Sequence, residues 1–252
     1  MKKTVAALVM GALIALGFST NVQAGLLDNI QKKITDSASS VTGGSESGST
    51  SNLSTSQIIE GLKEALQVGT ETVVAQIGTT GGYNDDPAIH IPLPEKMQQA
   101  QSLMKKFGLS GMADDLEERL NRGAEAAAPK TKEILINAIS EMTVEDAQSI
   151  YSGPDDAATQ YFRKVSTGDL TETIRPIIEQ SLQDVGAISL YDSLVSQYKT
   201  YPLVPDIKTN LTDYTTDMTL EGLFHYLADE EAAIRNDPVK RTTEILTTVF
   251  GN

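Results

Sequence analysis

The polar residues whose types and spacing best suit ligand binding stand in residues 153–163. Asp155 and Asp156 are followed by Gln160 and Arg163, so two carboxylates, an amide and a guanidinium fall within about two turns of a helix. Such a set could line a polar pocket. Paired aspartates at the start of a helix also cap free amides and complement the helix dipole, so the same pattern is typical of a structural helix start.

A second set of polar residues could hold a divalent metal ion. Three carboxylates and one imidazole stand four residues apart: Asp217, Glu221, His225 and Asp229. This spacing places them along one side of a helix, and both groups are metal ligands. The apolar residues Leu220, Phe224 and Leu227 define a different, buried face, and His225 points away from it. We therefore expect a solvated helix face and no metal site.

The chain contains few of the residues that nucleophilic catalysis usually requires. There are two histidines, His90 and His225, and no Gly-x-Ser-x-Gly elbow, so a Ser-His-Asp hydrolase is not indicated. His90 stands between two isoleucines, and we expect it to be a partly exposed loop residue. There is no cysteine, which excludes thiol catalysis, thiolate metal sites and disulfides. We expect no cofactor.

Two further polar clusters adjoin apolar stripes. They are Asn121 and Arg122 with Glu125, and Glu230 and Glu231 with Arg235. Glu231 and Arg235 are four residues apart, in the order that favours an ion pair on a helix. If these charges are buried they must be paired, because an uncompensated buried charge is very costly. We expect ion pairs between helices, with a shared pocket as the alternative.

The elements that must position these residues are helices. From Ser54 onward apolar residues recur at helical spacing, interrupted by Gly78, Pro129 and Gly153. Thr143 with Asp146 three residues later predicts a helix start with a capping box. Residues 155–185 predict two successive helices, and Asp237 with Pro238 predicts the start of a last one. No internal repeat of fixed period is present, so a solenoid is not indicated. The sequence predicts one all-α, bundle-like domain of about nine to ten helices over residues 55–252.

One stretch within this domain is not helical. In residues 79–94 the apolar Ile89, Ile91 and Leu93 alternate, while Pro92 and Pro94 exclude a central strand. We expect an extended loop laid over the helices, with its apolar side chains held in a groove.

The N-terminus has the composition of a secretory signal peptide. Lys2 and Lys3 precede an apolar run that is short for a bilayer span, and small residues around Ala24 suit a peptidase cut. Residues 25–34 then form a short amphipathic piece, and residues 36–54 are dominated by serine, glycine and threonine, as in a flexible tether. We expect residues 1–24 to be removed, and the protein to be exported, most simply to the periplasm.

The net charge and the hydropathy of the chain limit the classes of partner that we expect. The formal net charge is −14 at pH 7, which repels phosphate backbones, so nucleic acid is not expected as a partner. Beyond the signal peptide no apolar run is long enough to cross a membrane, so we do not expect an integral membrane protein. A cationic ligand or a basic protein would be attracted weakly at physiological salt.

Five long strings stand in order along the helical region: GLKEALQVGTETVVAQIG, HIPLPEKMQQAQSLMKKFGL, ADDLEERLNRGAEAAAP, GPDDAATQYFRK and EGLFHYLADEEAAIRNDPVKRTTEILTTVFG. They resemble a bacterial exported family catalogued as domain of unknown function 4197, from about Leu62 to Gly251. The resemblance implies a helical, signal-bearing envelope protein of Gram-negative-type bacteria. That family has no established activity and therefore supplies no catalytic residues.

These observations favour a periplasmic, non-enzymatic helical protein that binds a protein partner or a small ligand. The candidate site is the loop at residues 83–93, closing over a pocket edged by five polar residues. With Tyr83 of the loop, the candidate ligand-binding residues are Asp155, Asp156, Gln160, Arg163 and Arg122. The alternative is a carboxylate-dependent hydrolase acting on an envelope polymer, although the lack of tryptophan counts against sugar stacking. A structural scaffold or oligomer is a third alternative.

Overall fold

The computed structural model describes residues 54–106, 110–198 and 210–237. The chain divides into two units, Met1–Ser51 and Asn52–Asn252, and all described residues belong to the second. The predicted signal peptide, the amphipathic piece and nearly all of the tether lie outside the described residues. The all-α prediction is confirmed for the described part of the chain, which holds helices and no strand.

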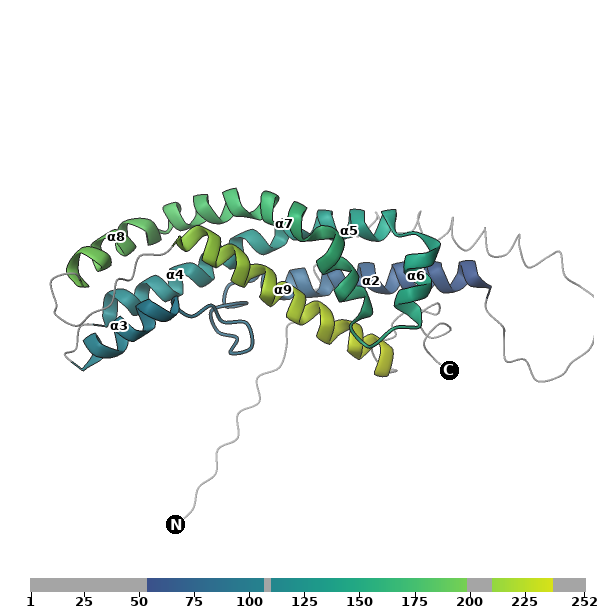
Figure 1. The fold of residues 1–252 in the computed structure, drawn as a ribbon, viewed down its shortest axis with the longest axis horizontal. Coiled ribbons are helices and arrows are strands. Elements are labelled where there is room, and N and C mark those ends of the chain that lie inside the picture. Colours follow the sequence, from purple (N-terminus) through teal and green to yellow (C-terminus); the bar gives the residue numbers. More distant parts are fainter. Residues whose placement is uncertain (1–53, 107–109, 199–209, 238–252) are drawn as a thin grey trace, which may run out of the picture. The chain divides into compact units, whose positions relative to one another are not determined.

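The helices follow one another as α2 (Thr55–Ile77), α3 (Glu95–Lys105), α4 (Gly111–Ala127), the 3-10 helix η1 (Ala128–Lys130), α5 (Thr131–Glu141), α6 (Val144–Tyr151), α7 (Ala157–Asp184), α8 (Ala187–Tyr198) and α9 (Leu211–Asn236) (Figure 1). Among the described residues this is fewer α-helices than the nine to ten expected. The predicted helix after Asp237 lies outside the described residues.

One cause of the difference is α7, which was predicted as two helices and is continuous over 28 residues. Gly168 and Pro176 both lie inside it without ending it. Its buried side chains recur every four residues and form one unbroken stripe: Phe162, Ser166, Leu170, Ile174, Ile178 and Leu182. Packing of that stripe outweighs the local cost of the glycine and the proline.

Several helix boundaries follow from local sequence, two of them as predicted. Ser54 accepts the N–H of Gln57 and donates its own N–H to the Gln57 side chain, which forms a capping box at the start of α2. Thr143 and Asp146 form the predicted box at the start of α6. Pro129 interrupts the chain between α4 and α5 as the 3-10 helix η1.

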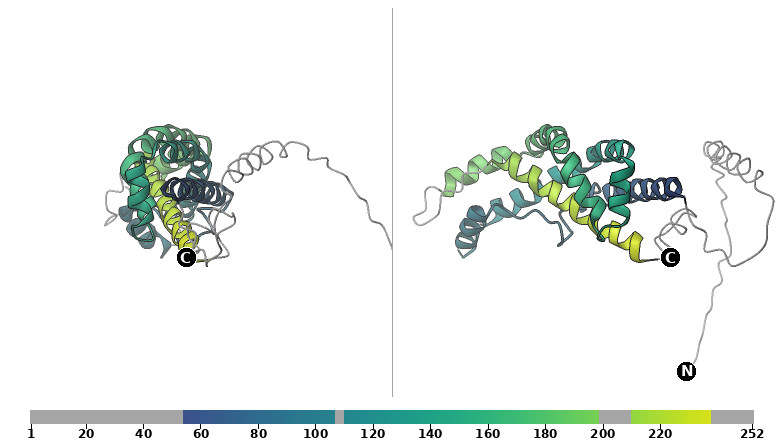
Figure 2. Two further views of the ribbon diagram at one scale, coloured as in Figure 1. Left: turned by 90° about the vertical axis from the view of Figure 1, so that its right-hand side faces the viewer. Right: turned by 45° about the vertical axis from the view of Figure 1, so that its right-hand side comes forward.

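The long helices α7 and α9 lie side by side, and α2 and α4 pack against this pair (Figures 1 and 2). Their shared core is aliphatic and includes the fully buried Ile77, Leu116, Leu120, Leu170 and Ile174. Each such side chain contributes about 1.5–3 kcal/mol when it leaves water. Since the chain has no cysteine, this core stabilises the described fold without disulfides.

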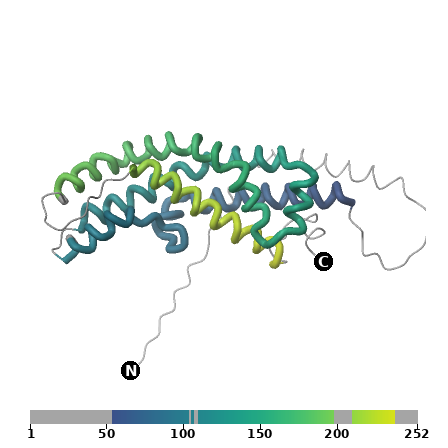
Figure 3. The backbone as a smooth tube through the Cα atoms, in the orientation of Figure 1, coloured from purple at the N-terminus to yellow at the C-terminus, as the bar shows by residue number. Residues whose placement is uncertain are grey.

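The segment between α2 and α3, residues 78–94, is called the α2–α3 loop below. It leaves the end of α2, runs beside α9 and returns to the start of α3 (Figure 3). Its apolar side chains Ile89, Ile91 and Leu93 are buried, which confirms that they are held against the helices. The prediction that the loop is extended throughout is wrong, because residues 79–89 consist mainly of turns. Within the described ranges, none of the helices combines the length and apolar character that a membrane span requires.

Candidate functional site

One face of α4 holds the α2–α3 loop in place through hydrogen bonds. Three polar side chains of α4, Glu117, Asn121 and Glu125, are spaced four residues apart and therefore line one side of the helix. Each of them accepts a backbone N–H of the loop. The loop thus obtains from side chains the hydrogen bonds that a strand would obtain from a neighbouring strand.

Glu125 makes the densest of these contacts. Its side chain is 6% exposed, and its Oε1 accepts the backbone N–H groups of Gly81, Tyr83 and Asn84 at 3.0, 3.2 and 3.1 Å. Its Oε2 accepts a hydrogen bond from Nη1 of Arg122 at 2.9 Å. A carboxylate offers about four acceptor positions, so four donors occupy Glu125.

Asn121 pairs with the backbone of Ile91 in both directions. Its Oδ1 accepts the Ile91 N–H at 2.8 Å, and its Nδ2 donates to the Ile91 carbonyl at 2.9 Å. Glu117 accepts the Leu93 N–H through Oε2 at 3.3 Å. These bonds hold the extended end of the loop and place Ile91 and Leu93 in the core.

His90 is bound at both ring nitrogens. Nδ1 lies 2.9 Å from the Asn84 carbonyl oxygen, and Nε2 lies 2.9 Å from Oε1 of Glu117. A carbonyl and a carboxylate only accept hydrogen bonds, so a protonated ring nitrogen of His90 donates to whichever of the two it faces. His90 is partly exposed, as predicted, and it joins two turns of the loop to α4.

The other side of the loop is held by α9. Tyr83 is fully buried, and its hydroxyl donates to the Thr219 carbonyl at 2.7 Å. The ring lies against Gly222, where a Cβ would come within 2.6 Å of the Tyr83 ring. Tyr226 hydrogen-bonds the carboxylate of Asp86. Tight packing on α9 therefore requires a residue without a side chain at position 222.

Burial and hydrogen bonding change the acidity of these phenols. Burial raises the pKa of Tyr83 far above its ordinary value of 10.0. The hydrogen bond to the Asp86 carboxylate, followed by burial, raises the pKa of Tyr226 to about 12. Both phenols therefore remain neutral donors at physiological pH.

The outer side of the loop forms an open hollow of about 500 Å³, called the polar hollow below. Its lining residues are Gln76, Thr79, Thr80, Gly81, Gly82, Asp85, Asp86 and Pro87. Hydroxyl, amide and carboxylate groups dominate this lining, and none of its residues carries a positive charge.

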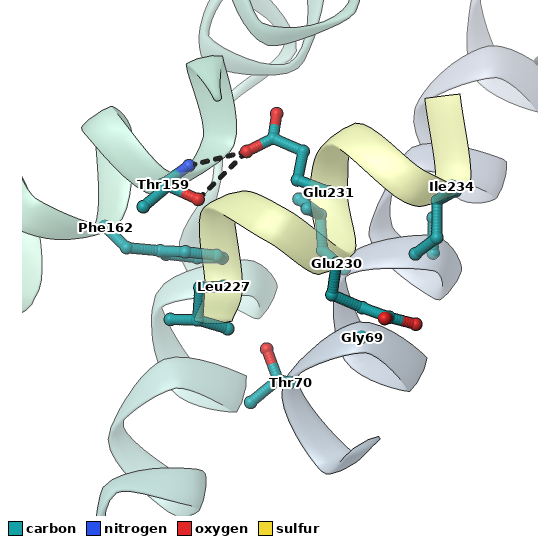
Figure 4. A pocket seen from close by; sticks show the side chains of 10 residues that line it. Gly69, Thr70, Thr159, Phe162, Leu227, Glu230, Glu231 and Ile234 are labelled. Carbon is teal, nitrogen blue, oxygen red and sulfur yellow. Dashed lines mark hydrogen bonds between the residues drawn. The ribbon is translucent and has the colours of Figure 1, made fainter. Parts of the chain in front are cut away.

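A second buried carboxylate, Glu231 of α9, caps the start of α7. Oε1 accepts the Ala158 N–H at 2.8 Å, and Oε2 accepts the Thr159 N–H and hydroxyl at 2.9 and 3.0 Å (Figure 4). Arg235 donates to the same carboxylate from Nη2 at 2.9 Å. Arg235 also donates to the Ile150 carbonyl at 2.8 Å. This ion pair thus neutralises the amide end of α7 and the carbonyl end of α6.

The cavity beside Glu231 is too small for a ligand. Its volume is about 20 Å³, which admits one water-sized probe. Side chains of α2, α7 and α9 line it, including Thr70, Phe162 and Leu227 (Figure 4). The buried hydroxyl of Thr70 has no hydrogen-bond partner among the described residues. We therefore assign this cavity to packing and not to binding.

The expectation of ion pairs between helices is corrected at both clusters. Arg122 and Glu125 both belong to α4, and Glu231 and Arg235 both belong to α9. Contacts between elements come instead from backbone N–H groups that donate to the carboxylates. The physical reason is that loop and helix-start amides need acceptors that their own segments do not supply.

The predicted site residues fall into two groups. Tyr83 and Arg122 belong to the loop and α4 cluster described above. Asp155, Asp156 and Gln160 lie at the start of α7, where Gln160 donates to Asp156 at 2.9 Å and Asn236 donates to Asp155 at 3.1 Å. The predicted capping role of the two aspartates is not seen, because Asp156 makes no side-chain cap bond and Glu231 supplies the acceptor.

Arg163 is engaged one turn further along α7. It donates to both carboxylate oxygens of Glu221 at 2.8 Å and lies 4.5 Å from the centre of the Phe224 ring. The hydrogen bond raises the pKa of Arg163 and lowers the pKa of Glu221. This pairing occupies the guanidinium fork that would otherwise bind an anion.

The acidic row on α9 is solvent-exposed, as predicted: Asp217, Glu221, His225 and Asp229. Within it His225 lies 3.5 Å from Asp229, and Glu221 is paired with Arg163. In the part of the chain that the structure describes, no group of three or more histidine, aspartate or glutamate side chains could hold a metal ion.

A hydrolase would need a carboxyl whose pKa is raised, so that it can serve as general acid. The pKa of Asp146 is lowered by hydrogen bonds from Thr143, and that of Glu221 is lowered by Arg163. In both groups the pKa is lowered, whereas a general acid requires a raised pKa. The two buried glutamates, Glu125 and Glu231, have their acceptor positions filled by protein donors. The hydrolase alternative gains no support from these four groups.

Sequence reasoning identified Arg122, Asn121 and Glu125 as a polar cluster but missed Glu117 and the role of all three toward the loop. A signal was present, because Glu117, Asn121 and Glu125 recur every four residues beside the apolar Leu116 and Leu120. Polar side chains at that spacing next to a buried stripe indicate a helix face in contact with another backbone.

Taken together, these features define an all-α domain in which buried carboxylates organise a loop and a helix start. The chain belongs to the family described as "Protein of unknown function (DUF4197)", whose sequence profile matches residues 52–251. This confirms the resemblance seen in the sequence. No curated protein and no solved structure matches the chain significantly.

Proposed function

We propose that this protein is exported to the periplasm and acts there as a binding protein without catalytic activity. Its ligand is a small polar molecule that carries a positive charge, and the binding surface is the polar hollow. The N-terminal signal sequence supports export. The observation that carries the binding proposal is the fixed wall of the hollow, built by a loop that two helices hold from the other side.

A fixed wall favours binding because the ligand does not have to order it. Gly81 and Asn84 are tied to Glu125, and Asp86 is tied to Tyr226. The loop therefore presents its outer groups in one arrangement before a ligand arrives. Preorganisation of this kind lowers the entropic cost of binding.

The class of ligand follows from the charges at the hollow. Asp85, Thr79 and Thr80 are exposed, and Asp86 is half-buried. The Thr79 hydroxyl donates to the Gln76 carbonyl at 2.8 Å and can still accept a hydrogen bond. The overall charge of −14 also favours the approach of cations. An amine or guanidinium group beside Asp85, with hydroxyl contacts to Thr79 and Thr80, suits this lining.

Native mass spectrometry on protein purified from the periplasm without chelators tests the proposal. The wild-type protein should carry an additional mass that is lost on denaturation, and its polypeptide should begin at Gly25. Thr80→Trp fills the hollow from an exposed position and should remove the additional mass. Thr173→Trp, at an exposed position on α7, is the matched control and should retain it.

Three results would contradict the proposal. An additional mass that persists in Thr80→Trp would place the ligand elsewhere, and Asp156→Ala with Arg163→Ala would then test the start of α7, whose binding role stays a prediction. A wild-type protein that is free of ligand and stays monomeric would favour a protein partner instead. A ligand-free dimer would favour the scaffold alternative.

A further inference from the structure

An apolar groove lies between the first turns of α2 and the end of α6, and is called the α2–α6 groove below. Its volume is about 280 Å³, and its lining residues are Thr55, Ile58, Ile59, Ala147, Gln148, Tyr151 and Ser152. Ile58 and Ile59 are only half-buried, and Tyr151 is 36% exposed. Apolar side chains of this size at a surface gain free energy when another apolar segment covers them.

The last described helix ends beside this groove. Arg235 of α9 donates to the carbonyl groups of Ile150 and Tyr151 at 2.8 and 3.4 Å, and so attaches the end of α9 to the last turn of α6. Tyr151 is itself a lining residue of the groove. The described chain stops two residues later, at Asp237.

The end of α9 and the groove lie at the same end of the domain. α9 runs broadly opposite to α2 and is inclined to it (Figure 1), and its residue Ile234 packs on Ala65 of α2. The end of α9 is therefore near the first half of α2, which begins with the turns that hold Ile58 and Ile59. From Asp237 to Ile245 the chain can span about 12 Å as a helix and about 27 Å when extended.

The residues beyond Asp237 have a complementary pattern. Ile245, Leu246, Val249 and Phe250 recur at a spacing that places them on one face of a helix. The family match extends to residue 251 and so includes this segment, whereas it begins at residue 52 and leaves out the other amphipathic segment, residues 25–34. The C-terminal segment is therefore the occupant that belongs to the same domain as the groove.

We propose that residues 238–252, which lie outside the described residues, bind in the α2–α6 groove of the same molecule and place Ile245, Leu246, Val249 and Phe250 against Ile58, Ile59 and Tyr151. The segment then covers the apolar surface at this end of the domain. This inference is independent of the polar hollow, which lies at the opposite end of α2.

Paramagnetic relaxation enhancement in the intact protein tests the proposal. Because the chain has no cysteine, Thr248→Cys introduces a single site for a spin label. The label should broaden the methyl signals of Ile58 and Ile59. It should leave the methyl signal of Ile91 sharp, because Ile91 belongs to the loop at the far end of α2, a helix about 34 Å long.

A pair of variants checks that the apolar face causes the contact. Adding Leu246→Asp to the labelled protein should abolish the broadening at Ile58 and Ile59. Adding Thr243→Asp, in the same segment but outside the apolar set, should preserve it. Unchanged broadening with Leu246→Asp would overturn the proposed apolar contact.

Three further results would overturn the proposal. One is the absence of broadening at Ile58 and Ile59 in the Thr248-labelled protein. Another is broadening of these methyl signals by a label at Ser37→Cys and not at Thr248, which would assign the groove to the N-terminal segment. The third is broadening that also occurs when labelled and isotope-enriched molecules are separate chains in a mixture, which would assign it to a second copy.

Discussion

The Glu231 carboxylate of α9 accepts the backbone N–H of Thr159 at 2.9 Å, although 72 positions separate the two residues. The start of α7 is therefore capped by another helix and not by the aspartates that precede it. The same carboxylate binds Arg235, whose guanidinium reaches the end of α6. One residue pair on α9 thus determines how two other helices meet.

Replacing Glu231 by alanine should destabilise the domain by about 3 kcal/mol, because it leaves buried amides at the start of α7 without an acceptor and removes the carboxylate that pairs with Arg235, whose side chain is 10% exposed. The free energy of unfolding in urea measures this loss. Asp156→Ala is the control, and it should change stability by less than about 0.5 kcal/mol, because Asp156 bonds only the exposed Gln160. Equal losses in both variants would mean that Asp156 caps α7 after all.

Glu125→Ala should cost a similar amount, about 3 kcal/mol, because three loop N–H groups lose their acceptor and Arg122 loses the nearer of its two carboxylate partners. Glu118 provides a matched control on the same helix. It pairs with the same Arg122 at 3.4 Å but is exposed, so Glu118→Ala should cost less than about 0.5 kcal/mol. A loss in Glu125→Ala no larger than that of the control would show that the loop does not depend on this carboxylate.

Gly222→Ala should destabilise the domain by about 1–3 kcal/mol, because the new methyl group would lie 2.6 Å from the buried ring of Tyr83. Gly168 in α7 faces open space. Gly168→Ala should therefore stabilise the protein, by about 0.5–1 kcal/mol, through the usual preference for alanine in a helix. Thermal unfolding of the two variants should show melting temperatures shifted in opposite directions, and a shift of the same sign in both would contradict the packing described.

Tyr83→Phe should change how the stability of the protein depends on pH, because it removes the buried phenol group. At pH 8 the free energy of unfolding of the variant should be about 1 kcal/mol lower than that of the wild type, because the hydrogen bond from Tyr83 to the Thr219 carbonyl is missing. Burial raises the pKa of Tyr83 above its ordinary 10.0. Above pH 10 only the unfolded state releases this proton, so wild-type stability falls by up to about 1.4 kcal/mol per pH unit from this group.

The variant lacks this titration, so the stability gap between wild type and Tyr83→Phe should narrow from pH 10 upward. Unfolding free energies measured from pH 8 to pH 11 provide the comparison. A gap that stays constant across this range would mean that Tyr83 reaches solvent in the folded protein.

Local sequence predicts much of this fold. The capping boxes Ser54–Gln57 and Thr143–Asp146 and the break at Pro129 depend only on neighbouring residues. The box at Thr143 and the break at Pro129 are present as expected, whereas the box at Ser54 was not predicted. The burial of Ile91 also follows from local alternation and prolines. These features were predictable because their causes lie within a few residues.

The polar contacts could not be predicted in the same way. Asp156 has the ideal local position for a cap, yet the bond comes from Glu231, which tertiary packing brings to the helix start. Likewise, nothing near Gly81 or Tyr83 indicates that Glu125 will accept their N–H groups. Which acceptor serves a buried amide is decided by the packing of distant helices, and a single sequence does not encode that locally.

The most direct test of this account is amide hydrogen exchange at the α2–α3 loop, because the proposed function depends on a loop that is fixed before a ligand binds. The amides of Tyr83, Asn84 and Ile91 should be protected nearly as strongly as those in the middle of α9, and Glu125→Ala should remove the protection at Tyr83 and Asn84 while leaving Ile91 protected. Exchange at Tyr83 and Asn84 as fast as in an unstructured chain, in the wild-type protein, would contradict the account.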